Sequence, residues 1–244
     1  MVKGLKKFYK LIESQLFYLL TKRNLIVLVI FNVTLTLFFL IESQIFKGSA
    51  YVDSYRTECL TLFTEGSFTF VKIFYLLFVL FINLSYFQGS YSNYSQYYIT
   101  DTKSKISFYI TKYLSLIIFD FIEFSIIYLI NTFIYASMPY GMYPFQNLDI
   151  YFSLFLSGIY YMFLSSIILM ISSSSLSLLI PVTLFWGGEI IRDSVSISLF
   201  FKKMVLFLTV TPTYDMGLPF GNLHAILMIV LTSLTISLII SLRD

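Results

Sequence analysis

Long apolar runs alternate with polar segments over most of this chain, and most of the runs are close to the length of a membrane-spanning helix. Such a helix needs about 20 predominantly apolar residues to cross the hydrocarbon core of a bilayer. A chain in that core must satisfy its backbone hydrogen bonds internally, which favours α-helices. The pattern therefore predicts an all-α polytopic membrane protein with six transmembrane helices. The six runs cover residues 24–41, 67–87, 107–136, 150–171, 176–191 and 223–241.

The run 176–191 is the shortest of the six. Pro181 lies inside it, and Gly187 and Gly188 lie near its end. Two topologies fit this run, a full span and a segment that re-enters the membrane from one side. A re-entrant segment would change the side of the membrane assigned to the residues that follow it.

Residues 3–23 precede the first run and form a basic amphipathic pattern. Lys3, Lys6, Lys7 and Lys10 are too closely spaced for a segment inside hydrocarbon. The apolar positions recur at helical spacing. They are Leu5, Phe8, Leu11, Ile12, Leu16 and Leu19. Such a helix lies in the membrane interface with its ammonium groups toward anionic lipid headgroups, and the alternative is a solvated basic tail.

The composition narrows the class of protein further. Apolar residues make up 58% and charged residues 12% of the 244 residues, whereas a soluble domain carries roughly 25% charged residues. A soluble globular enzyme is therefore not expected, and the hydrophobicity is too high for a disordered chain. The net charge of +3 is too small to indicate a nucleic-acid partner.

The distribution of Lys and Arg orients the predicted bundle. Six spans place both termini on one side, and cytoplasmic loops carry an excess of positive charge. With the N-terminus inside, the cytoplasmic side receives ten basic residues, which are Lys3, Lys6, Lys7, Lys10, Lys22, Arg23, Lys103, Lys105, Lys112 and Arg243. The opposite side receives fewer basic residues, which are Lys47, Arg56, Lys72, Arg192, Lys202 and Lys203. Both termini are therefore expected to be cytoplasmic.

The chain offers few residues for chemistry that needs a metal ion or a nucleophile. It contains one cysteine, Cys59, and one histidine, His224, whereas zinc sites use several such ligands. His224 is interpreted as an interfacial residue at the start of the last run. The phosphate-binding motif G-x-x-x-x-G-K-[ST] does not occur. We therefore expect no catalytic residues, no metal site and no cofactor in this chain.

Two carboxylates, Asp120 and Glu123, interrupt the third apolar run. They are three residues apart and share a helix face. They lie 8 and 11 residues beyond Lys112, which is roughly 12–16 Å along a helix. Ionisable residues at that depth are functional candidates by default. One interpretation is a polar patch in a translocation path or a proton site, and the other is an interhelical hydrogen bond that fixes helix packing.

A second charged cluster follows Gly187 and Gly188 at the end of the run 176–191. Glu189, Arg192 and Asp193 are spaced at i, i+3 and i+4 and share a helix face. This spacing is typical of a neutralised group of ion pairs at the membrane interface. The functional alternative is an outer gate.

The polar segment after the second run contains regularly spaced tyrosines. Tyr91, Tyr94 and Tyr97 or Tyr98 recur at helical spacing. They are followed by Asp101, Lys103 and Lys105. A short cytoplasmic helix of this kind inserts its aromatic stripe into a groove on a partner protein. The alternative is an aromatic belt at the level of the lipid headgroups.

Taken together, the layout resembles the membrane subunit of an ABC-type exporter of the second exporter class. Members of that family have an amphipathic N-terminal elbow helix, six spans and cytoplasmic termini. Their coupling helix lies between the second and third spans, after an aromatic residue and before a lysine that opens the third span. In this sequence the elbow corresponds to Lys3–Arg23 and the coupling segment to Tyr91–Lys105, between Phe87 and Lys112.

The resemblance implies one transmembrane permease domain over residues 1–244 in a bacterial cytoplasmic membrane. It implies a separate ATPase subunit that binds ATP and Mg²⁺, and a second permease copy or a homologous permease as partner, with membrane lipids around the bundle. The substrate is expected to be apolar or amphipathic, such as a peptide, an antimicrobial or a lipid-like molecule. Small members of this kind resemble peptide-toxin exporters or bacteriocin-immunity permeases.

Three other functions are weighed against the exporter. A secondary carrier would be driven by protons through Asp120 and Glu123. A membrane-embedded immunity or binding protein would bind without turnover. A lipid-modifying membrane enzyme would need a nucleophile and a base or a metal set, which the sequence does not offer.

Overall fold

All the regular secondary structure in the described part of the chain is α-helical. The computed structural model describes residues 2–49, 56–88, 102–136, 148–172, 174–193, 198–210 and 221–242, and these ranges contain no β-strand. The helices are, in chain order, α1 (Val2–Leu19), α2 (Lys22–Ser49), α3 (Arg56–Gln88), α5 (Thr102–Ala136), α6 (Leu148–Ile171), α7 (Ser174–Asp193), α8 (Leu199–Leu208) and α9 (Gly221–Leu242). The all-α class predicted from the apolar runs is thereby confirmed.

Five helices in the described ranges are long and apolar enough to cross a membrane. Their apolar stretches are Lys22–Ile41, Phe70–Phe87, Ile106–Ile134, Tyr151–Ile171 and Asn222–Leu242. These stretches agree closely with five of the predicted runs. The remaining run forms α7, whose apolar stretch Ser175–Ile191 is shorter. Whether α7 spans or re-enters therefore stays a prediction.

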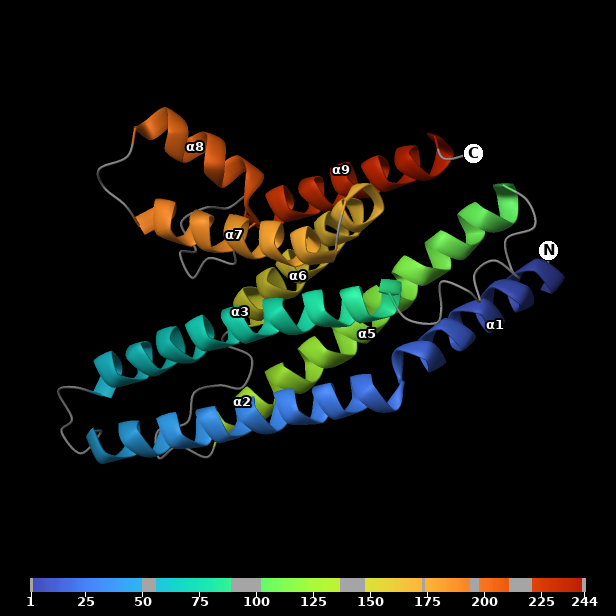
Figure 1. The fold of residues 1–244 in the computed structure, drawn as a ribbon. Coiled ribbons are helices and arrows are strands. Elements are labelled where there is room, and N and C mark those ends of the chain that lie inside the picture. The colour runs from blue at the N-terminus through green and yellow to red at the C-terminus, as the bar shows by residue number, and fades with distance from the viewer. Residues whose placement is uncertain are drawn as a thin grey trace.

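Helices α3, α5 and α6 form the centre of the bundle. Helices α2 and α3 pack against each other, α2 also packs on α5, and α6 carries α7 and α9 on its other side (Figure 1). Because α2 and α9 lie at the periphery, many of their Leu, Ile and Val side chains remain exposed. Inside a bilayer these exposed apolar faces contact lipid. The start of α1, the start of α5 and the end of α9 lie toward the same end of the bundle (Figure 1).

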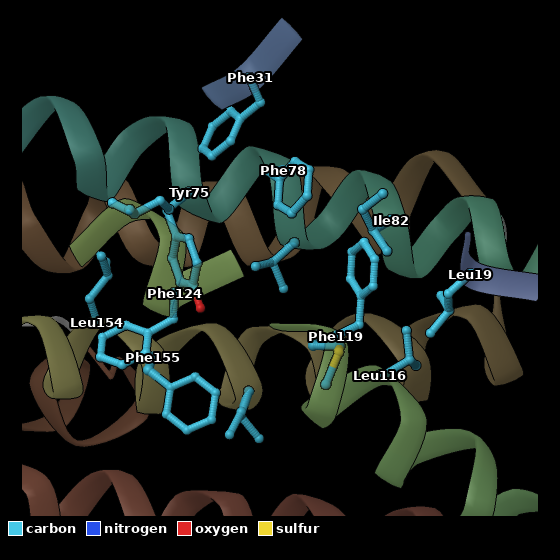
Figure 2. Packing of buried hydrophobic residues seen from close by; sticks show 14 of the residues in the cluster. Leu19, Phe31, Tyr75, Phe78, Ile82, Leu116, Phe119, Phe124, Leu154 and Phe155 are labelled. Atoms are coloured by element: carbon cyan, nitrogen blue, oxygen red, sulfur yellow. The ribbon is translucent and has the colours of Figure 1, made fainter. Parts of the chain in front are cut away.

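Aromatic side chains fill much of the space between the central helices. Phe31 of α2 stacks on Phe78 of α3 with ring centroids 4.6 Å apart. Tyr75, one turn earlier on α3, reaches toward Phe124 of α5 and Leu154 of α6 (Figure 2). Aromatic packing of this kind brings α2, α3, α5 and α6 into a single core and fixes their relative rotation.

Helix α1 lies against the start of α5 rather than apart from the bundle. Leu16 and Leu19, which belong to the predicted apolar face, pack against the protein core. Tyr9, Lys10 and Phe17 of the same helix are exposed. The sequence predicted that this apolar face contacts lipid. In the structure, part of it contacts the protein core instead. The predicted position of this helix in the membrane interface stays a prediction.

Candidate functional site

The two carboxylates of the third apolar run face the protein interior. Asp120 and Glu123 lie near the middle of α5, with 3% and 0% of their surface exposed. Tyr75 of α3 donates a hydrogen bond from its hydroxyl to Asp120 Oδ1 over 2.6 Å. Asn32 of α2 donates from Nδ2 to Glu123 Oε1 over 2.8 Å. These bonds join α5 to two different neighbours, so the two residues share a helix face but not a partner.

One oxygen of each carboxyl group remains without a hydrogen-bond partner among the described residues. These atoms are Asp120 Oδ2 and Glu123 Oε2. A buried polar atom without a partner is costly, and in a membrane it marks a candidate site for a proton or a polar ligand. The two observed hydrogen bonds are interhelical, as expected if these carboxyl groups fix the packing of the helices. A role in a translocation path stays a prediction.

A glycine on α6 makes room for the contact between Tyr75 and Asp120. A Cβ atom at Gly158 would lie 2.9 Å from Tyr75 Cε1 and 3.4 Å from Asp120 Oδ2. Real Cβ atoms essentially never approach another heavy atom as closely as the first of these distances. Gly158 is therefore a close-approach position, where the backbone of α6 lies directly against the tyrosine ring.

A buried ion pair connects α3 to α7. Lys72 Nζ lies 3.1 Å from Glu189 Oε2, and the two side chains are 8% and 15% exposed. The sequence grouped Glu189 with Arg192 and Asp193, whose side chains lie outside the described residues although their backbone belongs to α7. The observed partner of Glu189 comes from a different helix, 117 residues away along the chain.

A second polar cluster, which we call the α1 junction, consists of Gln15, Tyr86, Phe87, Thr111 and Lys112. Gln15 is fully buried. Its Nε2 donates to Thr111 Oγ1 over 2.9 Å, and its Oε1 accepts from the Tyr86 hydroxyl over 3.3 Å. Lys112 Nζ lies 3.7 Å from the centroid of the Phe87 ring, a cation–π contact. The α1 junction therefore joins α1 to the end of α3 and the start of α5.

The connection between α1 and α2 is fixed to the same end of α3. Arg23 donates to Ser85 Oγ over 2.5 Å, and Ser85 donates to Asn24 Oδ1 over 3.0 Å. Asn24 in turn donates from Nδ2 to the carbonyl oxygen of Leu19 over 3.0 Å. These contacts hold the last turn of α1 and the first turn of α2 against the end of α3.

The predicted docking segment is only partly within the described residues. Tyr91, Tyr94, Tyr97, Tyr98 and Asp101 lie outside them. Lys103 and Lys105 belong to the first turns of α5, but their side chains are outside the description. The same holds for the side chains of Lys3, Lys6 and Lys7 in α1, whereas Lys10 is exposed. Docking by this segment stays a prediction.

Several residues of these clusters were not identified from the sequence as site residues. Gln15, Asn32 and Tyr75 are single polar groups on otherwise apolar helix faces, and that isolation is the signal that could have marked them. From the sequence, Lys72 was counted only among the basic residues on the side opposite the cytoplasm. No sequence pattern indicates that it pairs with Glu189.

The clusters do not form a metal centre. Among the described residues, no group of three or more His, Cys, Asp or Glu side chains is placed to hold a metal ion. The carboxyl groups of Asp120 and Glu123 can accept hydrogen bonds or carry a proton. Comparison with protein-family models, curated protein sequences and solved structures finds no match for this chain. The functional argument therefore rests on the geometry of these clusters.

Proposed function

We propose that this chain is the permease subunit of an ATP-driven ABC-type exporter. A separate ATPase chain binds ATP and Mg²⁺, and two copies of the permease, or one copy and a homologous permease, form the path. In this proposal α7 is the fifth of six spans, α1 is the interfacial elbow helix, and both termini are cytoplasmic in a bacterial cell membrane. The substrate is an apolar or amphipathic peptide, antimicrobial or lipid-like molecule.

The observation that carries the proposal is the α1 junction. Helices α3 and α5 flank residues 89–101, the core of the segment proposed to dock the ATPase. Gln15 bonds to Tyr86 on the α3 side and to Thr111 on the α5 side. A push on the docking segment is therefore transmitted to α3, α5 and α1 as one unit. This is the mechanical connection that an external ATPase needs in order to reorient the spans.

Copurification tests the ATPase partner. Protein extracted from its native membrane in mild detergent is expected to bring a nucleotide-binding chain with it. The measurement is mass spectrometry of the purified complex together with its rate of ATP hydrolysis. A single species without a nucleotide-binding chain, obtained in several mild detergents, would contradict the proposal.

The same preparation tests the docking segment through Tyr94→Ala combined with Tyr97→Ala. Truncating an aromatic anchor at the centre of an interface costs about 2 kcal/mol of binding free energy, which is roughly 30-fold in affinity. We expect the double variant to lose the ATPase and its ATP-dependent transport while it still inserts in the membrane. Tyr9→Ala, which changes an exposed tyrosine on α1, is the control and is expected to retain the ATPase.

A proton-driven secondary carrier is the second candidate function. The partnerless oxygens of Asp120 and Glu123 favour it, because a buried carboxyl group can carry a proton across a barrier. In vesicles that contain this chain alone, a carrier would move protons down an imposed pH gradient, and Asp120→Asn would stop that movement. We expect no such movement from the chain alone, and Asp120→Asn is expected to match the unmodified protein in this assay.

An immunity or binding protein without transport is distinguished by the same preparations. It would bind its target without an ATPase chain and without ATP-dependent transport. Copurification of an active ATPase would therefore separate it from the exporter.

A further inference from the structure

An open groove lies between α5 and α9, on the side of the bundle away from α2. Both helices pack on α6 and run in opposite directions (Figure 1). Phe163 of α6 also lines the groove. The groove extends along α5 from Ile106 to Ile117 and along α9 from Ser233 to Ile240. Its volume is about 330 Å³, within the range of small-ligand pockets.

The walls of the groove are mainly apolar, although two tyrosines of α5 and two serines of α9 also line it: Tyr109, Tyr113, Ser233 and Ser237. Ser233 donates its hydroxyl to the carbonyl oxygen of Val230 over 2.8 Å, and Ser237 donates to that of Ser233 over 3.0 Å. Both hydroxyl groups are therefore bonded within α9. Their small side chains give the groove its depth, while Ile106 and Ile110, about half exposed, form its open edge. An apolar ligand fits these walls better than a polar one.

Along its α5 wall, which is longer than its α9 wall, the groove has about the length of one leaflet of a bilayer. Along α5 it rises from Ile106 to Ile117, which is roughly 16 Å at 1.5 Å per residue. The hydrocarbon of one leaflet is about 15 Å thick, half of the ~30 Å core. The groove begins at the end of the bundle where α5 starts and α9 ends (Figure 1). It therefore has the extent of a lipid acyl chain that enters from one membrane surface.

The chain is basic just beyond this end of the groove. Lys103 and Lys105 occupy the first turns of α5, directly before Ile106. In the sequence, Arg243 and Asp244 follow the last residue of α9, and Asp101 directly precedes α5, so these five charged residues together leave one net positive charge. Basic residues at a membrane surface attract anionic lipid headgroups. The apolar groove fits an acyl chain, and the positive charge at its end fits an anionic headgroup. Both features are found together in an anionic phospholipid.

We propose that the groove between α5 and α9 binds one acyl chain of an anionic phospholipid. The lipid comes from the leaflet in which α5 begins, and its headgroup lies near Lys105. The groove itself does not depend on the exporter proposal, since its lining contains neither the tyrosines of the docking segment nor the buried carboxylates. Only Lys103 and Lys105, at the end of that segment, are common to both proposals. Occupation by the lipid holds α9 at a fixed separation from α5.

The test uses a phosphatidylglycerol whose acyl chain carries a photoreactive diazirine, in nanodiscs that contain the full chain. Mass spectrometry of the labelled peptides is expected to place most of the label on 106–117 and 233–240. Unlabelled phosphatidylglycerol is expected to compete. A photoreactive phosphatidylcholine is expected to label about fivefold less, because one basic residue near the surface contributes roughly 1 kcal/mol toward an anionic lipid.

Two variants on α9 separate the groove from the general lipid surface. Ser237→Phe fills the groove and is expected to reduce the labelling severalfold. Thr235→Phe adds the same ring at an exposed position that does not line the groove, and is expected to leave the labelling unchanged. Even labelling along all exposed apolar faces, or labelling that survives Ser237→Phe, would overturn the proposal.

The other occupant to be tested is a second copy of the chain. Ser237→Cys is introduced into a Cys59→Ser background, so that the new thiol is the only one in the chain. The lipid proposal predicts no disulfide-linked dimer through position 237 after mild oxidation in nanodiscs or native membranes. Efficient formation of a disulfide-linked dimer through position 237 would assign the groove to the second copy and overturn the proposal.

Discussion

Glu189→Ala is expected to lower the free energy of unfolding by about 3 kcal/mol, the lower end of the effect of removing one partner of a buried ion pair, because the Lys72 and Glu189 side chains are still 8% and 15% exposed. The substitution takes away the carboxylate that lies 3.1 Å from the ammonium group of Lys72. That ammonium group is inside a predicted span, where a charge is costly. The measurement is unfolding of the purified protein in mixed micelles of increasing denaturing detergent.

Three further variants give this prediction its controls. Glu13→Ala removes an exposed carboxylate on α1 and is expected to change stability by less than about 0.5 kcal/mol. Lys72→Met combined with Glu189→Leu replaces both charges with apolar groups and is expected to recover much of the loss. Exchange of the two charges, Lys72→Glu with Glu189→Lys, is expected to do the same. A loss in Glu189→Ala no larger than in Glu13→Ala would contradict a stabilising pair.

Gly158→Ala is expected to destabilise the protein by about 1–3 kcal/mol, the usual effect of overpacking a well-packed core. The added methyl group would lie 2.9 Å from the Tyr75 ring. Either the ring or α6 must move, and both movements disturb the hydrogen bond between Tyr75 and Asp120. Thermal unfolding in detergent, followed by loss of helical circular dichroism, measures the effect.

Gly187→Ala is the matched control for this substitution. Gly187 also lies in a helix, but no heavy atom lies within 4 Å of a Cβ placed there. Alanine is the better helix former by up to about 1 kcal/mol, so Gly187→Ala is expected to be neutral or stabilising. In a Tyr75→Ala background the ring is gone, and Gly158→Ala is expected to have little further effect. Equal destabilisation in both backgrounds would show that the ring is not the cause.

These two predictions concern contacts that link α3 to α7 and α3 to α5 and α6. Both contacts lie inside the bundle, and one helix, α3, supplies Lys72 and Tyr75 one turn apart. A substitution at one position is expected to affect the other only through a shift of α3, since the pair of Lys72 with Glu189 and the pair of Tyr75 with Asp120 have no residue in common. In the exporter proposal, movement of α3 would reach α7 through Lys72 and α5 through Tyr75.

The helical class and five spanning stretches could be predicted from the sequence with close boundaries. The physical reason is local. Each apolar run meets the length requirement of a bilayer by itself, and its backbone has no alternative hydrogen-bond partner in lipid. The sequence did not determine whether α7 spans the membrane, because its apolar stretch is short and is interrupted by Pro181 and by the glycine pair.

The role of α1 shows where a local pattern is insufficient. The spacing of Leu16 and Leu19 identified an apolar face correctly, but a stripe of apolar residues fits lipid and protein equally well. Only the packing of α1 on α5 showed that these leucines face the core. Gln15 lies on the same packed side, where Tyr86 and Thr111 satisfy its amide.

By itself, the sequence determined that this chain forms apolar helices, and that Asp120, Glu123 and Glu189 stand out as ionisable groups in or near them. The tertiary structure decided which group each of them meets: Tyr75, Asn32 and Lys72, at separations of 45, 91 and 117 residues. Helical periodicity fixes the direction in which a side chain points, but not which helix lies there. That depends on how the helices pack together, and hence on the shapes of side chains distributed over the whole chain.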